Sequence, residues 1–166
     1  MTSAADGVFF DIAGNGTPVR LGWTAPGSGN AFLALPDSNG IVTNGTQLFG
    51  NFTPQPASSS PNGFLALAAY DKRDHGGNDD GVIDQKDRIF SSLRLWIDEN
   101  HDGICQPEEL NKLPDLGVLS IDLTYSLSHR VDQFGNVFRY RADINSGISG
   151  QSSVDRKAFD VFFTGK

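Results

Sequence analysis

The hydrophobic pattern at the start of the chain predicts short strands separated by turns. Residues 8–10 and 19–23 alternate apolar and polar side chains and are expected to pair as a hairpin. Residues 31–35 form another apolar run, which predicts a further strand. Residues 46–50 suit one helical turn that ends at a glycine. Residues 53–61 are rich in proline and serine and predict a surface loop.

The last third of the chain shows the same alternation. Residues 116–127 and 137–144 predict a second hairpin, joined by a turn around residues 134–136. A polar loop is expected at 146–153, and a last strand at 158–163 is expected to return to the sheet. Antiparallel strands are therefore predicted in the first and last parts of the chain, and the middle part has another pattern.

The middle of the chain has helical spacing instead. Apolar positions predict a helix over 62–71 and a second helix over 84–93. Residues 95–97 read as a short strand, and a proline followed by two glutamates predicts a third helix over 107–113. This order predicts an α+β fold, in which paired EF-hand-like calcium loops with short helices pack on antiparallel β-hairpins.

We expect a single calcium-binding domain over residues 1–166. Its predicted parts are the N-terminal hairpins and loop (8–61), the EF-hand-like pair (62–115), and the C-terminal β-hairpin with the final strand (116–164). A hydrophobic content of 38% with 12 phenylalanines is enough for one core of its own.

The loop over residues 98–109 has the spacing of an EF-hand calcium loop. Gly103 stands at the sixth position, where the sharp turn needs positive φ. A calcium ion takes about six to eight oxygen ligands, and alternate side chains of such a loop can point inward to supply them. The predicted ligands, at positions 1, 3, 5, 7 and 12, are Asp98, Asn100, Asp102, the backbone carbonyl of Ile104, and Glu109.

A second, less regular loop begins at residue 71. Its predicted ligands are Asp71, Asn78, Asp80, the backbone carbonyl of Val82, and Asp87. About five extra residues, 73–77, are expected to bulge out between the first two ligands, where consecutive glycines accept unusual turns. Asp87 is shorter than the usual closing glutamate, which predicts weaker binding or poorer discrimination of calcium from magnesium.

The distribution of charge favours a bound cation, although Asp, Asn and Gly also form plain turns. Residues 71–115 hold 12 of the chain's 20 acidic residues and six of its 13 basic residues. Carboxylates crowded this closely repel one another unless something neutralises them. We therefore expect Ca²⁺ as the cofactor, with two ions bound.

Two other stretches begin like calcium loops. Residues 11–16 have Ala13 where a ligand belongs, and residues 37–47 end on a glutamine instead of an acid. We interpret 11–16 as a turn and 37–47 as a weak or vestigial site. Cys105 and His101 leave a soft-metal site open as an alternative, while the simpler interpretation assigns Cys105 to packing.

Composition limits the partners that we expect. The isoelectric point is near 4.7, and the sequence has no basic stripe that could contact phosphates. We therefore expect no nucleic-acid partner. No apolar run approaches the ~18 residues of a spanning helix, so we expect no membrane insertion. A single cysteine excludes an internal disulfide. The expected partners are calcium and other domains of a larger parent protein.

Three runs, in this order, carry a resemblance: NGTQLFGNFTP, NGFLALAAYD, and NDDGVIDQKDRIFSSLRLWIDENHDGICQPEELNKLPDLGVLSIDLTY. Over residues 8–125 the chain resembles the calcium-binding module of large secreted RTX-type bacterial proteins. The self-processing module of iron-regulated RTX proteins is its best-known relative. The resemblance implies an extracellular or cell-surface location and folding that depends on calcium.

The resemblance also brings in an activity of the self-processing relatives, in which calcium triggers cleavage of an Asp-Pro bond near the start of the module. The new aspartyl end can then join a lysine amine. None of the eight prolines here follows an aspartate, so that cleavage cannot occur within these residues. The leading hypothesis is a non-catalytic, calcium-stabilised module. The alternatives are a self-processing module whose scissile bond lies upstream of residue 1, and a dockerin-like adaptor, which the flanking hairpins disfavour.

Overall fold

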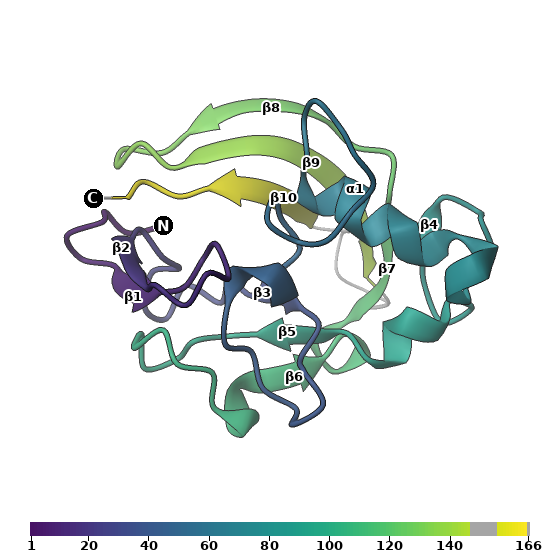
Figure 1. Ribbon diagram of the computed structural model, residues 1–166, viewed down its shortest axis with the longest axis horizontal. Helices are drawn as coiled ribbons and strands as arrows, with labels where there is room; N and C mark the ends of the chain where they lie inside the picture. Colours follow the sequence, from purple (N-terminus) through teal and green to yellow (C-terminus); the bar gives the residue numbers. More distant parts are fainter. Residues whose placement is uncertain (147–155, 166) are drawn as a thin grey trace.

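The computed structural model describes residues 1–146 and 156–165, where most of the regular structure is β-sheet (Figure 1). The strands are β1 (Val8–Phe10), β2 (Val19–Leu21), β3 (Phe32–Ala34), β4 (Val82–Ile83), β5 (Arg94–Trp96), β6 (Leu110–Lys112), β7 (Val118–Asp122), β8 (Ser126–Val131), β9 (Val137–Ser146) and β10 (Lys157–Phe162). The helical segments are α1 (Gly63–Ala68) and the 3-10 turns η1 (Gly45–Gln47), η2 (Ala69–Asp71), η3 (Arg73–His75), η4 (Arg88–Ser91), η5 (Pro107–Glu109) and η6 (Pro114–Leu116).

The largest sheet is built around the ten-residue strand β9. β10 runs antiparallel along one side of β9, with Lys157 opposite Asp143 and Phe162 opposite Val137. β8 and β7 share the other side, and β7 also pairs with β4. The strand expected over 116–127 is instead divided into β7 and the start of β8, and β8 and β9 make the hairpin. The last strand expected at 158–163 is confirmed as β10. Beyond residue 146, the polar loop expected at 146–153 lies outside the described residues.

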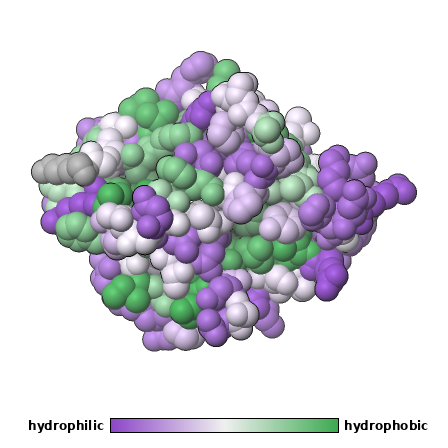
Figure 2. Space-filling view, viewed as in Figure 1, coloured by the Kyte–Doolittle hydropathy of each residue, from purple (hydrophilic) through white to green (hydrophobic). Residues whose placement is uncertain are grey.

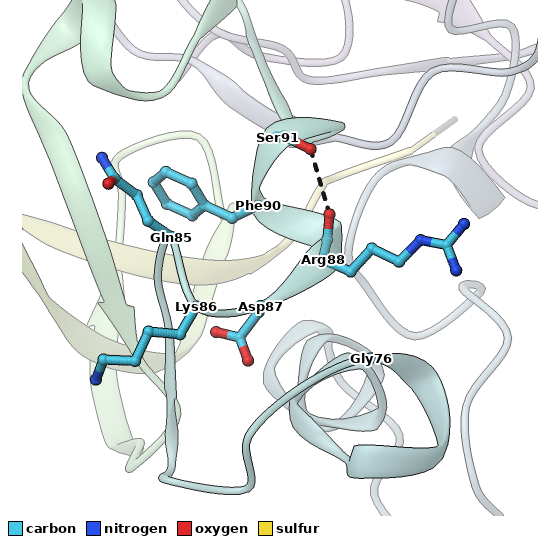
Figure 3. Close-up of a pocket in the computed structure, with 7 residues that line it drawn as sticks. All are labelled: Gly76, Gln85, Lys86, Asp87, Arg88, Phe90 and Ser91. Carbon is cyan, nitrogen blue, oxygen red and sulfur yellow. Dashed lines mark hydrogen bonds between the residues drawn. The ribbon is translucent and has the colours of Figure 1, made fainter.

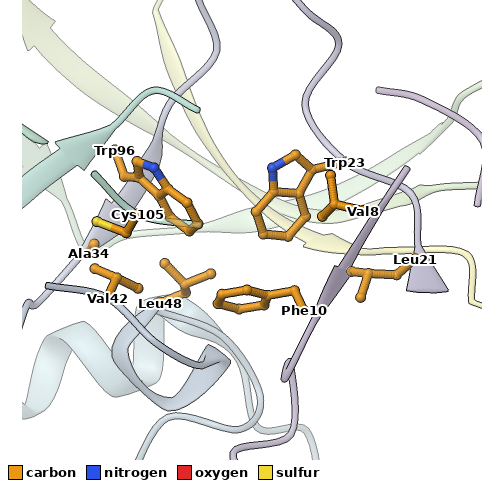
Figure 4. Packing of buried hydrophobic residues seen from close by; sticks show 9 residues of the cluster. All are labelled: Val8, Phe10, Leu21, Trp23, Ala34, Val42, Leu48, Trp96 and Cys105. Carbon is orange, nitrogen blue, oxygen red and sulfur yellow. The ribbon is translucent and has the colours of Figure 1, made fainter. Parts of the chain in front are cut away.

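An aromatic core joins the β1–β2 hairpin to the three-stranded sheet of β3, β5 and β6 (Figure 4). Trp23 and Trp96 are fully buried in it, with ring centroids 5.6 Å apart. The Phe10 ring lies 5.1 Å from Trp23 and 5.8 Å from Trp96. Burying each large apolar side chain contributes about 1.5–3 kcal/mol. The core therefore holds the N-terminal hairpin against β5, which leads directly into the loop at 98–109.

A second apolar core lies beneath α1 and β7. Leu67 of α1 packs there with Ile83 of β4, and both side chains are at most 1% exposed. The helix begins at the buried Asn62, whose side chain accepts a hydrogen bond from the Leu65 N–H. Because α1 runs on into η2, it delivers Asp71 to the first predicted metal loop.

The predicted α+β fold of paired EF-hand-like units is wrong. Within the described residues, regular α-helix is confined to the six residues of α1. The helix expected over 84–93 is only the 3-10 turn η4, and the helix expected over 107–113 is η5 followed directly by strand β6. β5 and β6 begin within a few residues of these turns and pair with each other. That pairing leaves no room for the ~12 residues that a stable helix needs.

The two predicted loops also do not pair with each other. β4, which lies in the first loop, pairs with β7 through Ile83 opposite Ile121. The second loop contributes no strand between residues 98 and 106. Each loop is therefore attached to a different sheet.

Both ends of the chain meet at the buried side chain of Asn136. Its Nδ2 donates to the Thr2 carbonyl at 2.9 Å, and its Oδ1 accepts from the Thr164 N–H at 3.0 Å. Figure 1 shows the two termini close together beside the β8–β9 turn. The predicted assignment of residues 1–166 to one domain stays a prediction.

Candidate metal loops

The second loop, residues 98–109, is folded around the carboxylate of Asp98. Asp98 Oδ1 accepts from the Asp102 N–H at 3.2 Å, and Oδ2 accepts from the Gly103 N–H at 2.9 Å. His101 and Gly103 have φ angles of 60° and 73°, which curl the backbone around this side chain. A Cβ atom at Gly103 would lie 2.8 Å from Val8, so the sixth position of the loop requires glycine.

Glu109 closes the second loop. Its Oε1 accepts from the Glu99 N–H at 3.0 Å, and its Oε2 accepts from the Gln106 N–H at 3.2 Å. Glu109 is 5% exposed and Asp98 is 4% exposed. The carboxylates predicted as first and last ligands are therefore both buried and held by the backbone of the loop.

The first loop repeats this arrangement around Asp71. Asp71 Oδ1 accepts from the Asp80 N–H at 3.2 Å, and Oδ2 accepts from the Gly81 N–H at 3.0 Å. Asp79 and Gly81 have φ angles of 63° and 83°, which match those of His101 and the glycine of the second loop. The two loops therefore share one backbone conformation around their first carboxylate.

The extra residues of the first loop include the 3-10 turn η3, after which the chain returns to its starting point. The Asp79 N–H donates to the Asp71 carbonyl at 2.8 Å. Asp87 closes the loop, since its Oδ1 accepts from the Asn78 N–H at 3.2 Å and its Oδ2 from the Asp84 N–H at 2.8 Å. Asp87 is 2% exposed, so the shorter closing residue is buried like Glu109.

In the described part of the chain, the four buried carboxylates form no ion pairs. Ion pairs within 4.0 Å involve other acids, and none includes Asp71, Asp87, Asp98 or Glu109. Burying an ion costs several kcal/mol unless an opposite charge or strong hydrogen bonds compensate it. Backbone N–H groups supply part of that compensation here.

The exposed acids of the first loop pair with lysine instead. Lys86 Nζ lies 3.1 Å from Asp80 and 3.5 Å from Asp84. A hydrogen bond from the Asn78 side chain, followed by the bond from Lys86, lowers the pKa of Asp80. β4 lies between these two acids in the chain, and the end of the molecule where Figure 1 places β4 is densely hydrophilic in Figure 2.

In the second loop, amides take the place of lysine. Asp102 Oδ2 accepts from Asn100 Nδ2 and from Gln106 Nε2, each at 2.9 Å. The Ile104 side chain is 64% exposed, in keeping with a position that is predicted to offer only its carbonyl. Val82, at the same position of the first loop, lies in β4.

The donor set of both loops fits calcium, because it consists of carboxylate, amide and carbonyl oxygens. Among residues 1–146 and 156–165, however, no three His, Cys, Asp or Glu side chains gather closely enough to hold a metal ion. The structure brings the first and last carboxylates into each loop and leaves Asp80 and Asp102 toward solvent. A cation held by all the predicted ligands of a loop would need the middle carboxylate of that loop to turn inward.

The two weaker loop candidates differ from each other. Asp11 accepts from the Asn15 N–H at 3.0 Å and from the Gly16 N–H at 2.8 Å, which repeats the bonds of the first carboxylate in the metal loops. Residues 11–16 thus form a turn, and their interpretation as a turn without a bound metal stays a prediction. Asp37 instead accepts from the N–H groups of residues two and four positions later, Asn39 and Ile41. Residues 37–47 therefore begin with a different turn.

Cys105 belongs to the aromatic core and is 9% exposed. Burial raises the pKa of its thiol, which disfavours the thiolate that a soft metal binds. His101 Nε2 lies 2.8 Å from the Asp6 carbonyl. These contacts support the packing interpretation of Cys105 over a soft-metal site.

Two tryptophans that the sequence pattern did not assign to the site donate side-chain hydrogen bonds to the second loop. Trp23 Nε1 donates to Asp98 Oδ2 at 2.7 Å, and Trp96 Nε1 donates to Glu109 Oε2 at 3.0 Å. Trp96 stands two positions before Asp98, so its proximity was readable from the chain. Trp23 lies 75 positions away, and no local signal reveals its contact.

A shallow pocket with a cavity volume of about 350 Å³ lies beside the first loop (Figure 3). It is lined by Gly76, Gln85, Lys86, Asp87, Arg88, Phe90 and Ser91. Figure 3 shows the Lys86 and Arg88 side chains pointing in opposite directions, so the two cations do not converge on a common ligand.

Residues 1–164 match the SPM domain family. The chain belongs to this family. The iron-regulated protein FrpA of Neisseria meningitidis serogroup C is 38% identical to this SPM domain over 120 residues. The match covers 72% of the chain but 10% of FrpA, so the chain spans only a small part of that relative. These comparisons confirm the relation to the self-processing modules of iron-regulated bacterial proteins.

Among the residues that the structure describes, none of the helical segments has the length and apolar composition of a membrane-spanning helix.

Proposed function

We propose that this SPM domain is a calcium-binding, calcium-stabilised module of a larger secreted or cell-surface bacterial protein, without catalytic activity of its own. The observation that supports this proposal most is the arrangement shared by the two loops. In each loop, a buried aspartate accepts from the N–H groups of the fifth and sixth positions. A second buried carboxylate closes each loop at the twelfth position.

Two calcium ions are expected, one in each loop. The residues that would hold them are Asp71, Asn78, Asp80, Val82 and Asp87 in the first loop and Asp98, Asn100, Asp102, Ile104 and Glu109 in the second. When bound, calcium would supply the positive charge that the buried carboxylates lack. Extracellular modules bind calcium with dissociation constants of about 10⁻⁴–10⁻³ M, since the ion is abundant outside the cell.

Thermal unfolding in calcium and in EDTA tests this proposal. At a calcium concentration 100 times the dissociation constant, each occupied site adds about 2.7 kcal/mol to the free energy of unfolding. For a domain of this size, each kcal/mol raises Tm by about 2–4 °C. We therefore expect Tm to rise by about 5–10 °C for each site. Equal melting curves in the two conditions would reject the proposal.

A matched pair of variants locates the second site. Glu109→Gln removes the charge of a buried, loop-closing carboxylate, while Glu108→Gln removes the same charge from its exposed neighbour. Calorimetric titration of metal-stripped protein should show that Glu109→Gln abolishes one binding event and that Glu108→Gln leaves both in place. Equal effects of the two substitutions would show that net charge, and not the loop, attracts the ion.

Membership of the SPM family favours a second candidate, calcium-dependent self-processing. None of the eight prolines follows an aspartate, so the scissile bond would have to precede residue 1. The test is a longer chain that carries an Asp-Pro bond ahead of residue 1, incubated with calcium or with EDTA. Two fragments that form only in calcium would establish this activity, and an intact chain in both conditions would exclude it.

A further inference from the structure

Both tryptophans of the chain donate their indole N–H to the second loop. Trp23 Nε1 lies 2.7 Å from Asp98 Oδ2, and Trp96 Nε1 lies 3.0 Å from Glu109 Oε2. Both tryptophans are 0% exposed, so water does not compete for these bonds. The carboxylate at each end of the loop therefore accepts a hydrogen bond from a different indole.

The two indole rings also pack against each other. Their ring centroids are 5.6 Å apart in an edge-to-face arrangement, and Figure 4 shows both rings on the same side of Phe10. Trp23 follows β2, whereas Trp96 ends β5, so the contact joins the N-terminal hairpin to the strand that enters the loop. A shift of either ring would displace a carboxylate at one end of the loop.

The first loop lacks this arrangement in the part of the chain that the structure describes. The Asp71 carboxylate accepts from Asp80 and Gly81, and the Asp87 carboxylate accepts from the backbone alone as well. Backbone donors belong to the loop and move with it, but indoles that are fixed in a core do not. The second loop therefore has its end carboxylates positioned from outside.

We propose that Trp23 and Trp96 are positioning residues for calcium in the second loop. This inference rests on the proposed function, because it assigns the two indoles a role toward the ion that the loop is proposed to bind. Each indole and one backbone N–H donate to the same carboxylate oxygen, and a second backbone N–H donates to the other oxygen. One lone pair of each carboxylate, on that other oxygen, is then left for the ion. Removing a partner that orients a metal ligand typically weakens metal affinity about 10–100-fold.

The test compares Trp23→Phe and Trp96→Phe with Phe10→Leu. Phe10 packs against both indoles in the same core and makes no hydrogen bond with the loop, so Phe10→Leu measures the effect of lost packing alone. Calcium titrations followed by NMR report each loop separately, through the amide signals of Gly81 and Gly103. The indole N–H signals of the unsubstituted chain report directly on the two carboxylates.

We expect each Trp→Phe variant to weaken binding at the second loop about 10–100-fold and to leave the first loop unchanged. Phe10→Leu should change the calcium affinity of each loop by less than about threefold. In the unsubstituted chain, both indole N–H signals should shift together with the Gly103 amide signal as calcium is added. If a Phe variant does not fold, benzothienylalanine at the same position keeps the ring shape and replaces the N–H by sulfur.

Three results would overturn the inference. First, the calcium affinity of the second loop could be unchanged without the indole N–H. Second, Phe10→Leu could weaken calcium binding at the second loop as much as the Trp variants do. Third, the indole N–H signals could stay unchanged when calcium is added. In each of these cases the unsubstituted chain still binds calcium and the proposed function survives. Absence of calcium binding by the unsubstituted chain would instead overturn the proposed function and this inference with it.

Discussion

The carboxylate of Asp71 accepts a hydrogen bond from the amide of Gly81, ten residues further along the chain. The equivalent bond in the second loop joins Asp98 to Gly103 across only five residues. The first loop therefore accommodates an insertion without losing the hydrogen bonds of its first carboxylate. Most of the inserted residues lie in the turn η3 and the glycine that follows it.

Deleting residues 72–76 should preserve the first loop. Gly77 would then follow Asp71 directly, which restores the twelve-residue spacing of the second loop. A shorter connection loses less entropy on closing, so we expect the first loop to bind calcium at least as tightly as before. The Gly81 amide signal in a calcium titration measures this, with Gly103 as the internal reference. Loss of binding at Gly81 alone would show that the insertion contributes a ligand.

Exchanging the closing residues should exchange the selectivity of the two loops. Asp87→Glu gives the first loop a longer arm that can offer calcium both oxygens, so we expect its preference for calcium over magnesium to rise roughly tenfold, or ~1.4 kcal/mol. Glu109→Asp should lower the preference of the second loop. Calcium titrations at a fixed, high magnesium concentration measure both effects. Unchanged selectivity in both variants would contradict this role of the closing residue.

The buried carboxyl of Asp160 should make stability depend on pH. Burial raises its pKa, while the Gly63 N–H and Arg139 act in the opposite direction. A raised pKa means that the folded state holds the proton more tightly than the unfolded state does. The resulting stabilisation is present below the ordinary pKa of 3.8 and is lost as pH rises through the folded-state pKa.

Asp160→Asn should therefore gain stability relative to the unsubstituted chain as pH rises from 4 to 7. The amide keeps an oxygen for the Gly63 N–H, which the Asp160 Oδ1 accepts at 3.0 Å. Denaturant melts at several pH values in EDTA measure the difference, with the exposed Asp115→Asn as the control. A difference that is flat with pH, or that falls, would contradict the prediction.

Asn136→Ala should loosen both ends of the chain. The substitution leaves the Thr2 carbonyl and the Thr164 N–H without their buried partner, which costs about 1–3 kcal/mol for an unsatisfied group. We expect Tm to fall by about 2–4 °C for each kcal/mol and the Thr164 amide to exchange faster. Asn145→Ala, at an exposed position of β9, is the control. Equal effects of the two substitutions would contradict this role of Asn136.

Short strands near the ends of the chain could be predicted because their alternation is a local property. Residues 8–10 and 31–35 form β1 and β3 as expected. The helices expected over 84–93 and 107–113 do not form. Strand pairing of β5 with β3 and β6 overrides the helical spacing, and a local pattern does not reveal that pairing. Local preference is weak compared with the hydrogen bonds and packing of a completed sheet.

The sequence by itself determined where the two loops begin, turn and close, because the backbone N–H groups that donate to Asp71 and Asp98 belong to the same loop. Their left-handed turns follow from Gly81 and Gly103, which also stand inside the loops. Only the tertiary structure decided what surrounds the loops: strands instead of helices after them, burial of their end carboxylates, and an indole donor from Trp23. These features depend on packing between segments as far as 75 residues apart, which no local pattern encodes.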